Sequence, residues 1–255
     1  MQHNGAPLRQ NAARAAGRHR ISARIGVRPT PAGLQAFPSI HTRLPSAVKL
    51  YLTPRTCALA VDIVAREIGV ALDLVWVDVR AKKLKDGSDL HSINPKGQVP
   101  ALETDDGQFL TEGGVIIQYL CDRQGADHLL PRSLDMERYR VLEWMSFMSS
   151  ELHKTFTPLF RANTPPAYRG IAIENLQRRF AWLDRVLATR GFLHAQRFTA
   201  ADAYCFTIVM WAELHAIDLA QWPHLHAYLQ RIATRPSVQT ALAAERDELA
   251  TQAAA

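Results

Sequence analysis

The sequence predicts an α/β unit over about residues 48–127 and an all-helical unit over about residues 134–250. In the first unit, short apolar runs of strand length alternate with helical patterns. In the second, every periodic stretch has helical spacing. No apolar run approaches the roughly 18 residues that a membrane-spanning helix needs. We therefore expect a soluble chain without a membrane partner.

The first 47 residues differ from the rest of the chain in charge. They contain seven arginines and no Asp or Glu, whereas the whole chain carries +6, so the remaining 208 residues sum to about −1. A uniformly basic protein would indicate nucleic-acid binding. Here the excess belongs to one Gly- and Pro-punctuated segment, and we expect no nucleic-acid partner. The composition of residues 1–47 fits a disordered segment, an Arg-rich targeting segment, or residues upstream of the true start.

Three cysteines are too few and too scattered for a disulfide framework, and their spacing matches no zinc motif. This favours a reducing, cytoplasmic setting and no metal.

The α/β unit begins with a strand, a helix and a second strand. Leu50–Leu52 are apolar, and Thr53-Pro54 end the run. From Ala58 the apolar residues have helical spacing as far as Gly69, and Leu72–Asp78 then alternate as a strand. Two short strands joined by a helix of about three turns predict a parallel pair.

Cys57 lies where the first strand turns into the helix. There the unpaired N–H groups and the positive dipole end of the helix lower the pKa of a thiol. The alternative is a small buried apolar cysteine with no chemical role.

A loop with two prolines follows the second strand. Asn94–Pro100 bracket a glycine between prolines, and Pro100 directly precedes an apolar strand, a place where a cis peptide turns the backbone. Leu102–Leu110 predict a hairpin with Asp106-Gly107 at its tip, and Thr111-Glu112-Gly113 open a helix that stops near Gly125. This order of elements, with a thiol at the first helix, is typical of a thioredoxin-like module. Its proline loop presents free backbone groups beside the thiol, where an extended peptide can pair as an added strand.

The helical unit begins with one long helix through Trp144 and Leu152 to Pro158. A second helix spans about residues 168–190. Thr199-Ala-Ala-Asp202 is a reciprocal capping pair that opens a buried apolar helix. Pro223 starts a further helix, and we expect the Ala- and Glu-rich C-terminal stretch to be frayed.

These motifs together resemble the cytosolic glutathione S-transferases. The resemblance covers about residues 48–245 and includes the cysteine, Asn94–Pro100, Leu110–Gly113 and the capped Phe198–Asp202 helix. Glu151–Lys154, followed by Phe156-Thr-Pro-Leu-Phe160, is similar to the bacterial beta class. The family fold joins a thioredoxin-like domain to an all-α domain.

The resemblance implies specific roles for individual residues. Cys57 would lie beside the glutathione sulfur, and His153 would donate or transfer a proton there. The glutathione-binding residues it implies are Lys82 (glycyl end), Val99 and the cis proline Pro100 (cysteinyl part), Glu112 and Gly113 (γ-glutamyl part), and Ser146, Ser150 and Glu151 around the histidine.

The resemblance also implies the activity and the assembly. We expect a homodimer that conjugates glutathione, bound as co-substrate, to a small apolar electrophile. The alternatives are a thiol transferase or peroxidase in which Cys57 is the redox nucleophile, and a non-catalytic binding relative of the same fold.

Two residues depart from the family pattern. Leu52 stands where many members carry a tyrosine, so no hydroxyl is offered there. Arg55 replaces a common glycine; we expect its charge to favour a thiolate at Cys57, and the alternatives for its other effect are that it crowds the site or that the position demands a φ that only glycine takes comfortably.

Overall fold

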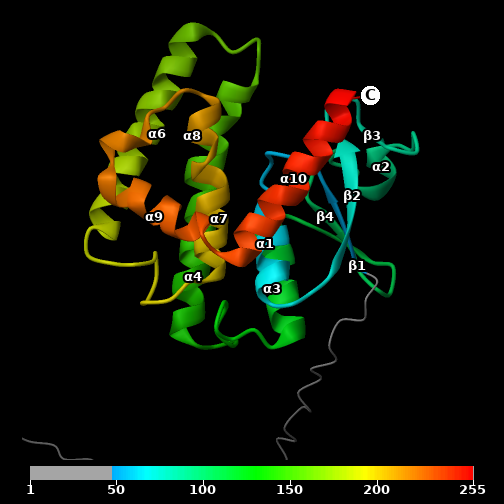
Figure 1. The fold of residues 1–255 in the computed structure, drawn as a ribbon, viewed down its shortest axis with the longest axis horizontal. Helices are drawn as coiled ribbons and strands as arrows, with labels where there is room; N and C mark the ends of the chain where they lie inside the picture. Colours follow the sequence, from blue (N-terminus) through cyan, green and yellow to red (C-terminus); the bar gives the residue numbers. More distant parts are fainter. Residues whose placement is uncertain (1–47, 255) are drawn as a thin grey trace, which may run out of the picture. The chain divides into compact units, whose positions relative to one another are not determined.

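The computed structural model describes residues 48–254, so the expectations for residues 1–47 lie outside the described part of the chain. Strands β1 (Val48–Leu52) and β2 (Leu72–Asp78) pair in parallel and are joined by helix α1 (Leu59–Glu67), as the sequence predicts (Figure 1). Four of the five β1 residues are buried, which explains its unbroken apolar pattern.

The remaining strands complete a five-stranded sheet in the order β3-β2-β1-β4-β5. The predicted hairpin is β4 (Ala101–Glu103) and β5 (Phe109–Thr111), and β4 runs antiparallel to β1. The sequence did not predict strand β3 (Lys83–Leu84) or the one-turn helix α2 (Leu90–Ile93), because elements of two and four residues are too short to show an apolar period.

Helix α3 (Gly113–Gln124) follows the hairpin and ends at Gly125, which adopts the left-handed conformation with φ 62°.

The predicted long helix is divided into segments of different winding. It consists of α4 (Met136–Phe147), a π-helical segment η1 (Met148–His153), the single turn α5 (Lys154–Phe156) and the 3₁₀ turn η2 (Thr157–Phe160). A π segment shifts the side chains that follow it out of the α-helical register. His153 lies at the end of this segment.

Five further elements follow before the C-terminal helix. Helix α7 opens with the predicted Thr199–Asp202 capping box. The elements are α6 (Pro166–Leu187), α7 (Ala200–Val209), α8 (Trp211–Leu214), η3 (Leu219–Gln221) and α9 (Pro223–Ala233).

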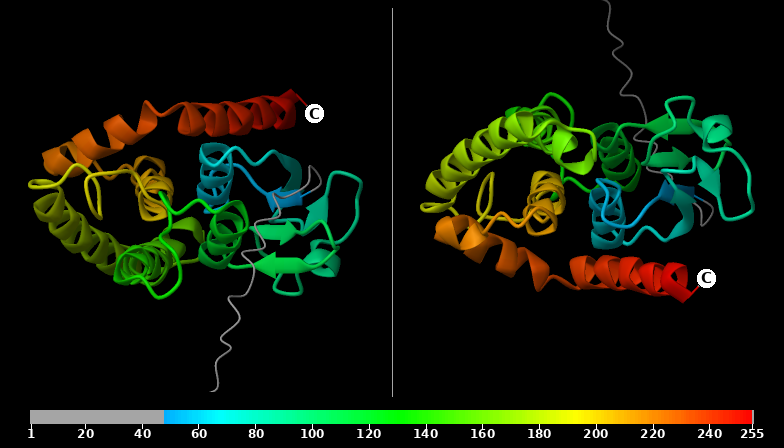
Figure 2. Two further views of the ribbon diagram at one scale, coloured as in Figure 1. Left: turned by 90° about the horizontal axis from the view of Figure 1, so that it is seen from below. Right: turned by 90° about the horizontal axis from the view of Figure 1, so that it is seen from above.

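The prediction of a frayed C-terminus was wrong. Helix α10 (Pro236–Ala254) is a regular helix that packs along α1, as Figure 2 shows. Its buried residues are two glutamates, Glu245 and Glu248, together with Ser237, Val238 and Ala241. Its buried face lacks the apolar stripe by which a packed helix is recognised in a sequence.

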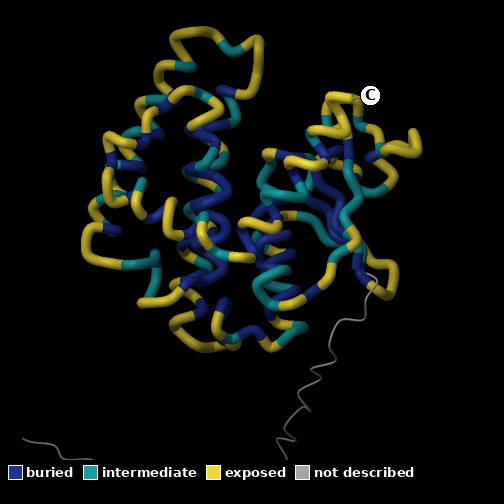
Figure 3. The backbone as a smooth tube through the Cα atoms, in the orientation of Figure 1, coloured by how far each residue is buried: buried dark blue, intermediate teal, exposed yellow. Residues whose placement is uncertain are grey.

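Helix α1 joins the two halves. It packs on α3 within the α/β part and on α7 and α10 of the helical part. One continuous set of buried side chains therefore runs from β1 through α1 into α7 (Figure 3). Among the described residues, no helix is long and apolar enough to cross a membrane.

Candidate functional site

The turn between β1 and α1 carries Cys57 two residues before the helix begins. The carbonyl of Cys57 accepts a hydrogen bond from Ala60 N at 3.3 Å, and the Thr56 hydroxyl donates to Thr53 O at 2.7 Å. These local bonds hold the turn. The Cys57 side chain is partly buried, and its Sγ lies 3.8 Å from Val99 O.

The thiol does not have the lowered pKa that the helix start led us to expect. Burial raises the pKa of Cys57 to about 12, which outweighs the lowering by its own backbone N–H. The charge of Glu112 raises this pKa further, and the cation that lowers it is Lys154, not Arg55 as we expected. Cys57 is therefore a neutral thiol at pH 7 in this structure.

The proline loop faces this thiol. The Val99–Pro100 peptide bond is cis, as predicted. Pro100 is buried while Val99 is half-buried. Pro100 lies against the start of α3, since a Cβ on Gly113 would be 3.7 Å from Pro100 Cγ. The loop thus places the Val99 carbonyl beside Cys57, and Pro100 of the same loop packs against the N-terminus of α3.

Glu112 and Gly113 form the N-terminus of α3. Glu112 is the N-cap residue, with φ 68°, and its side chain is 68% exposed. Lys96 of the proline loop donates to Glu112 Oε1 at 2.5 Å and to Thr111 Oγ1 at 2.7 Å. A carboxylate and an ammonium group beside free helix N–H groups fit the two charges of an α-amino acid.

Lys82 is attached to the same loop. It adopts φ 59°, and its Nζ donates to Gly97 O at 2.7 Å. Gly97 itself has φ 59°, and a Cβ there would lie 2.6 Å from His91 Nε2. Lys82 therefore holds the proline loop as well as placing a cation beside it.

His153 lies edge-on to Trp211, with ring centroids 4.8 Å apart. Burial, together with the charge of Lys154, lowers the pKa of His153 to about 4, although the charge of Glu112 opposes the shift. The imidazole is neutral at pH 7 and can accept a proton or donate its one N–H.

This combination of thiol, cis-proline loop and helix N-terminus matches known proteins. The family model described as the glutathione S-transferase N-terminal domain matches residues 55–123, and the one for the C-terminal domain matches residues 147–236. The chain is 43% identical over 198 residues to glutathione S-transferase GstA of Escherichia coli O157:H7, covering 78% of this chain and 98% of that one. The chain belongs to the glutathione S-transferase family.

Solved structures agree with this assignment. A glutathione transferase from Methylococcus capsulatus superimposes with a TM-score of 0.76 and 46% identity, covering 78% of this chain and 98% of that one. A sphingomonad glutathione S-transferase complexed with glutathione has a TM-score of 0.75 and 40% identity, covering 77% of this chain and 98% of that one.

In this transferase, two further residues near the thiol were not predicted from the sequence. Lys154 directly follows His153, and its charge acts on both Cys57 and His153. Tyr204 is a buried residue of α7 whose pKa is raised by burial and by the charges of Cys57 and Glu112. Lys154 could have been found as the neighbour of a candidate histidine. Tyr204 had no signal, because it belongs to an apolar run.

Three further predicted residues belong to the same helical stretch as His153, with Ser146 in α4 and Ser150 and Glu151 in η1. Ser146 and Ser150 are exposed, and the Ser150 hydroxyl donates to Ser146 O at 3.0 Å within their own helix. Glu151 forms an ion pair with Arg179 of α6.

The two departures from the family pattern behave differently. Leu52 is a buried core residue. Arg55 has φ 60°, the left-handed conformation that we expected to be strained for a side chain other than glycine.

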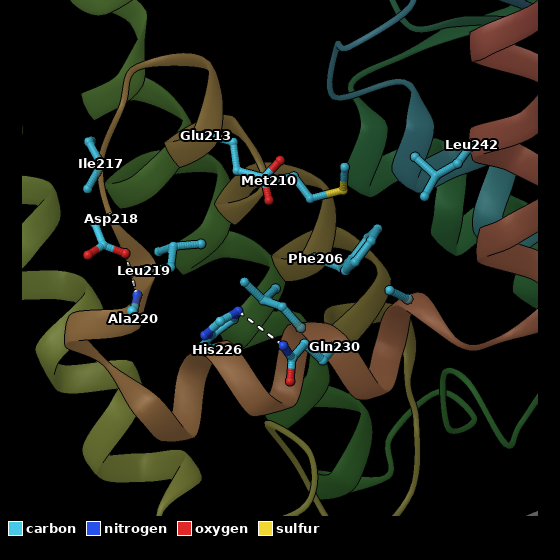
Figure 4. Close-up of a pocket in the computed structure, with 12 residues that line it drawn as sticks. Phe206, Met210, Glu213, Ile217, Asp218, Leu219, Ala220, His226, Gln230 and Leu242 are labelled. Carbon is cyan, nitrogen blue, oxygen red and sulfur yellow. Dashed lines mark hydrogen bonds between the residues drawn. The ribbon is translucent and has the colours of Figure 1, made fainter.

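Two pockets border helix α10. One of about 280 Å³ is lined by Arg55 and Thr56 of the Cys57 turn and by Trp211, which contacts His153. The other, of about 360 Å³, lies among α7, η3 and α9 (Figure 4) and contains no predicted site residue. Among the described residues, no group of three or more His, Cys, Asp or Glu side chains could hold a metal ion.

Proposed function

We propose that this glutathione S-transferase binds glutathione along the proline loop and conjugates its sulfur to a small apolar electrophile. One observation carries the proposal: Val99 O lies beside Cys57 Sγ next to a cis proline, and α3 begins directly behind that proline. An extended tripeptide pairing with Val99 would direct its cysteinyl part to Cys57 and its γ-glutamyl end to Glu112 and Gly113. Lys82 would meet the glycyl carboxylate.

The chemistry requires the glutathione thiol to lose its proton. His153 is neutral, and with its pKa lowered to about 4 it is a weak base toward a thiol, so its role is to donate its one N–H to the glutathione thiolate while the proton leaves to solvent. Lys154 supplies the positive charge that stabilises a sulfur anion in this region. The thiolate of glutathione would then attack the electrophile and displace its leaving group.

The raised thiol pKa favours conjugation over the alternative redox role of Cys57. A thiol with a pKa of about 12 has a thiolate fraction on the order of 10⁻⁵ at pH 7, so Cys57 is a poor resting nucleophile. Its more fitting role is to pack beside the glutathione sulfur, where exchange with oxidised glutathione would form a mixed disulfide and release one reduced glutathione.

The electrophile site is proposed to be the pocket at Arg55, Thr56 and Trp211. Two phenylalanines contact Trp211, and one of them, Phe156, is fully buried in the core. Phe160 is 48% exposed and contacts Trp211 at 5.1 Å between ring centroids. Trp211 and Phe160 together favour an aromatic electrophile.

We also propose beta-class membership, a homodimer and a cytoplasmic, detoxifying role. A structure titled as a bacterial beta class transferase from Sphingomonas chungbukensis is 39% identical, with a TM-score of 0.75, over 77% of this chain and 98% of that one. Exposed apolar side chains on β5, α3 and α4 are available to a second copy: Phe109, Val115 and Tyr139. All three cysteines are unpaired, which fits a reducing compartment.

The test measures two activities, conjugation with 1-chloro-2,4-dinitrobenzene and disulfide exchange, for the wild type, Cys57→Ala and His153→Ala. We expect Cys57→Ala to keep conjugation within about tenfold while losing disulfide exchange, and His153→Ala to lose about 10²-fold in kcat/KM. Cys121→Ala, which changes a buried cysteine of α3, is the control and should leave both activities intact. Loss of conjugation in Cys57→Ala with normal glutathione binding would instead make Cys57 the nucleophile.

A further inference from the structure

Helix α10 contacts the turn that carries Cys57 through one buried side chain. Glu245 is 5% exposed, and its Oε2 accepts a hydrogen bond from the backbone N–H of Arg55 at 3.1 Å. Arg55 lies two residues before Cys57. The bond joins segments 190 residues apart in the sequence, so it fixes the C-terminal helix to the site.

The other oxygen of the same carboxyl group has no partner. Glu245 Oε1 is buried, and no hydrogen bond reaches it within residues 48–254. A buried carboxylate with half of its acceptor capacity unused is costly to keep ionised. We therefore expect the group to change its protonation state within an accessible pH range.

Several charged groups surround Glu245. On the turn, Arg55 contributes its N–H and its charge, and on α1 Asp62 lies close enough for its charge to oppose ionisation. Asp62 is itself paired with Arg66 at 2.9 Å. Glu213 of α8 and Arg246 of α10 line the same pocket as Glu245.

The balance of these effects favours the neutral form. Burial raises the pKa of Glu245 to about 7, the charge of Asp62 adds to the rise, and Arg55 lowers it. A raised folded-state pKa means that protonation of Glu245 stabilises the fold below the unfolded value of about 4.5. This contribution is lost as the pH rises through about 7.

The bond to Arg55 has the opposite pH dependence. A carboxylate is a stronger acceptor of an N–H than a neutral carboxyl group. Raising the pH through 7 therefore strengthens the hydrogen bond that holds the Cys57 turn. The same change in pH lowers the free energy of unfolding. A side chain with a purely structural role would change the strength of the bond to Arg55 and the free energy of unfolding in the same direction.

We propose that Glu245 is a positioning residue, whose ionised carboxylate holds the Arg55 backbone and thereby the Cys57 turn, and whose protonation loosens that turn. The hydrogen bond between Glu245 and the Arg55 backbone is present in the protein without glutathione, so it does not depend on the proposed function. Only its effect on turnover rests on the proposed function.

The matched control is Glu248, one turn further along α10. It is as buried as Glu245, also 5% exposed, but its Oε2 accepts from Lys85 Nζ at 2.6 Å, away from the Cys57 turn. Glu245→Gln keeps an acceptor of the same size and removes the titration, and Glu248→Gln makes the same chemical change at a similar depth.

The experiment measures the protection of the Arg55 amide against hydrogen exchange between pH 6 and pH 8, corrected for the intrinsic exchange rate and without glutathione. We expect wild-type protection to rise about fivefold over this range, the difference between a neutral and a charge-assisted hydrogen bond. Glu245→Gln should show constant protection, and Glu248→Gln should behave like the wild type. Glu245→Asp keeps the charge but shortens the side chain, and it should lower protection at both pH values.

The proposal is overturned if Glu245→Gln keeps the wild-type pH dependence, or if Glu248→Gln abolishes it as well. The pH profile of kcat/KM for conjugation provides the second measurement, and its inflection near pH 7 should disappear in Glu245→Gln. A chain that shows the exchange effect but no conjugation would keep the inference and refute the proposed function.

Discussion

Replacing Arg55 by glycine should stabilise the protein. Arg55 has φ 60°, and a left-handed conformation costs a residue other than glycine roughly 1–2 kcal/mol. Glycine removes this strain but adds about 0.5–1 kcal/mol of backbone entropy to the unfolded chain. The Arg55 side chain is exposed, and the hydrogen bond to Glu245 uses its backbone N–H, which glycine retains. The net gain in the free energy of unfolding should be about 0.5–1 kcal/mol.

The assay is urea unfolding of the wild type, Arg55→Gly and Arg55→Ala at pH 7, followed by circular dichroism. Arg55→Ala removes the guanidinium but keeps a Cβ, so it should leave the free energy of unfolding unchanged within about 0.5 kcal/mol. The reasoning is refuted if Arg55→Gly gives no gain. It is also refuted if Arg55→Ala gives the same gain, because the guanidinium rather than the backbone would then be the source of strain.

Two further predictions concern the loop and the helices around the site. Gly97→Ala should lower the free energy of unfolding by about 1–2 kcal/mol, since Gly97 has φ 59° and the new methyl group would displace His91; thermal unfolding of this variant measures it. Glu67 of α1 pairs with Arg235 and bonds to Ser237, and these contacts lower its pKa although burial opposes them. Such a group stabilises above its unfolded pKa of about 4.5 and loses this effect as the pH falls through the lower folded value. Glu67→Gln should therefore lose about 1–2 kcal/mol at pH 7 but little at pH 3, where equal losses at both pH values would contradict the assignment.

The sequence predicted the sheet and its neighbours well because these elements have simple periodicities. β1 and β2 were predicted with bounds close to those observed, and the capping box at Thr199–Asp202 was confirmed. Helix α10 was missed because three of its five buried residues are a serine and two glutamates, so its sequence resembles that of an exposed polar helix. Its burial depends on α1, which lies far from it in the sequence.

The site was predicted in part. The cis peptide at Val99–Pro100 could be inferred from local sequence, whereas the left-handed backbone of Arg55 was signalled only by the glycine that the family commonly carries there. The pKa of Cys57 could not, because the desolvation that raises it comes from elements distant in sequence. For the same reason Tyr204 was missed, as only the fold brings α7 close to the thiol.

The most direct test of the proposed function is a crystal structure of the protein grown with reduced glutathione. The account predicts that the cysteinyl backbone of glutathione pairs with Val99 N–H and C=O, with its sulfur beside Cys57 and His153 and its γ-glutamyl end on Glu112 and Gly113. Glutathione bound elsewhere, or a loop at Val99–Pro100 that stays empty at saturating concentration, would contradict it.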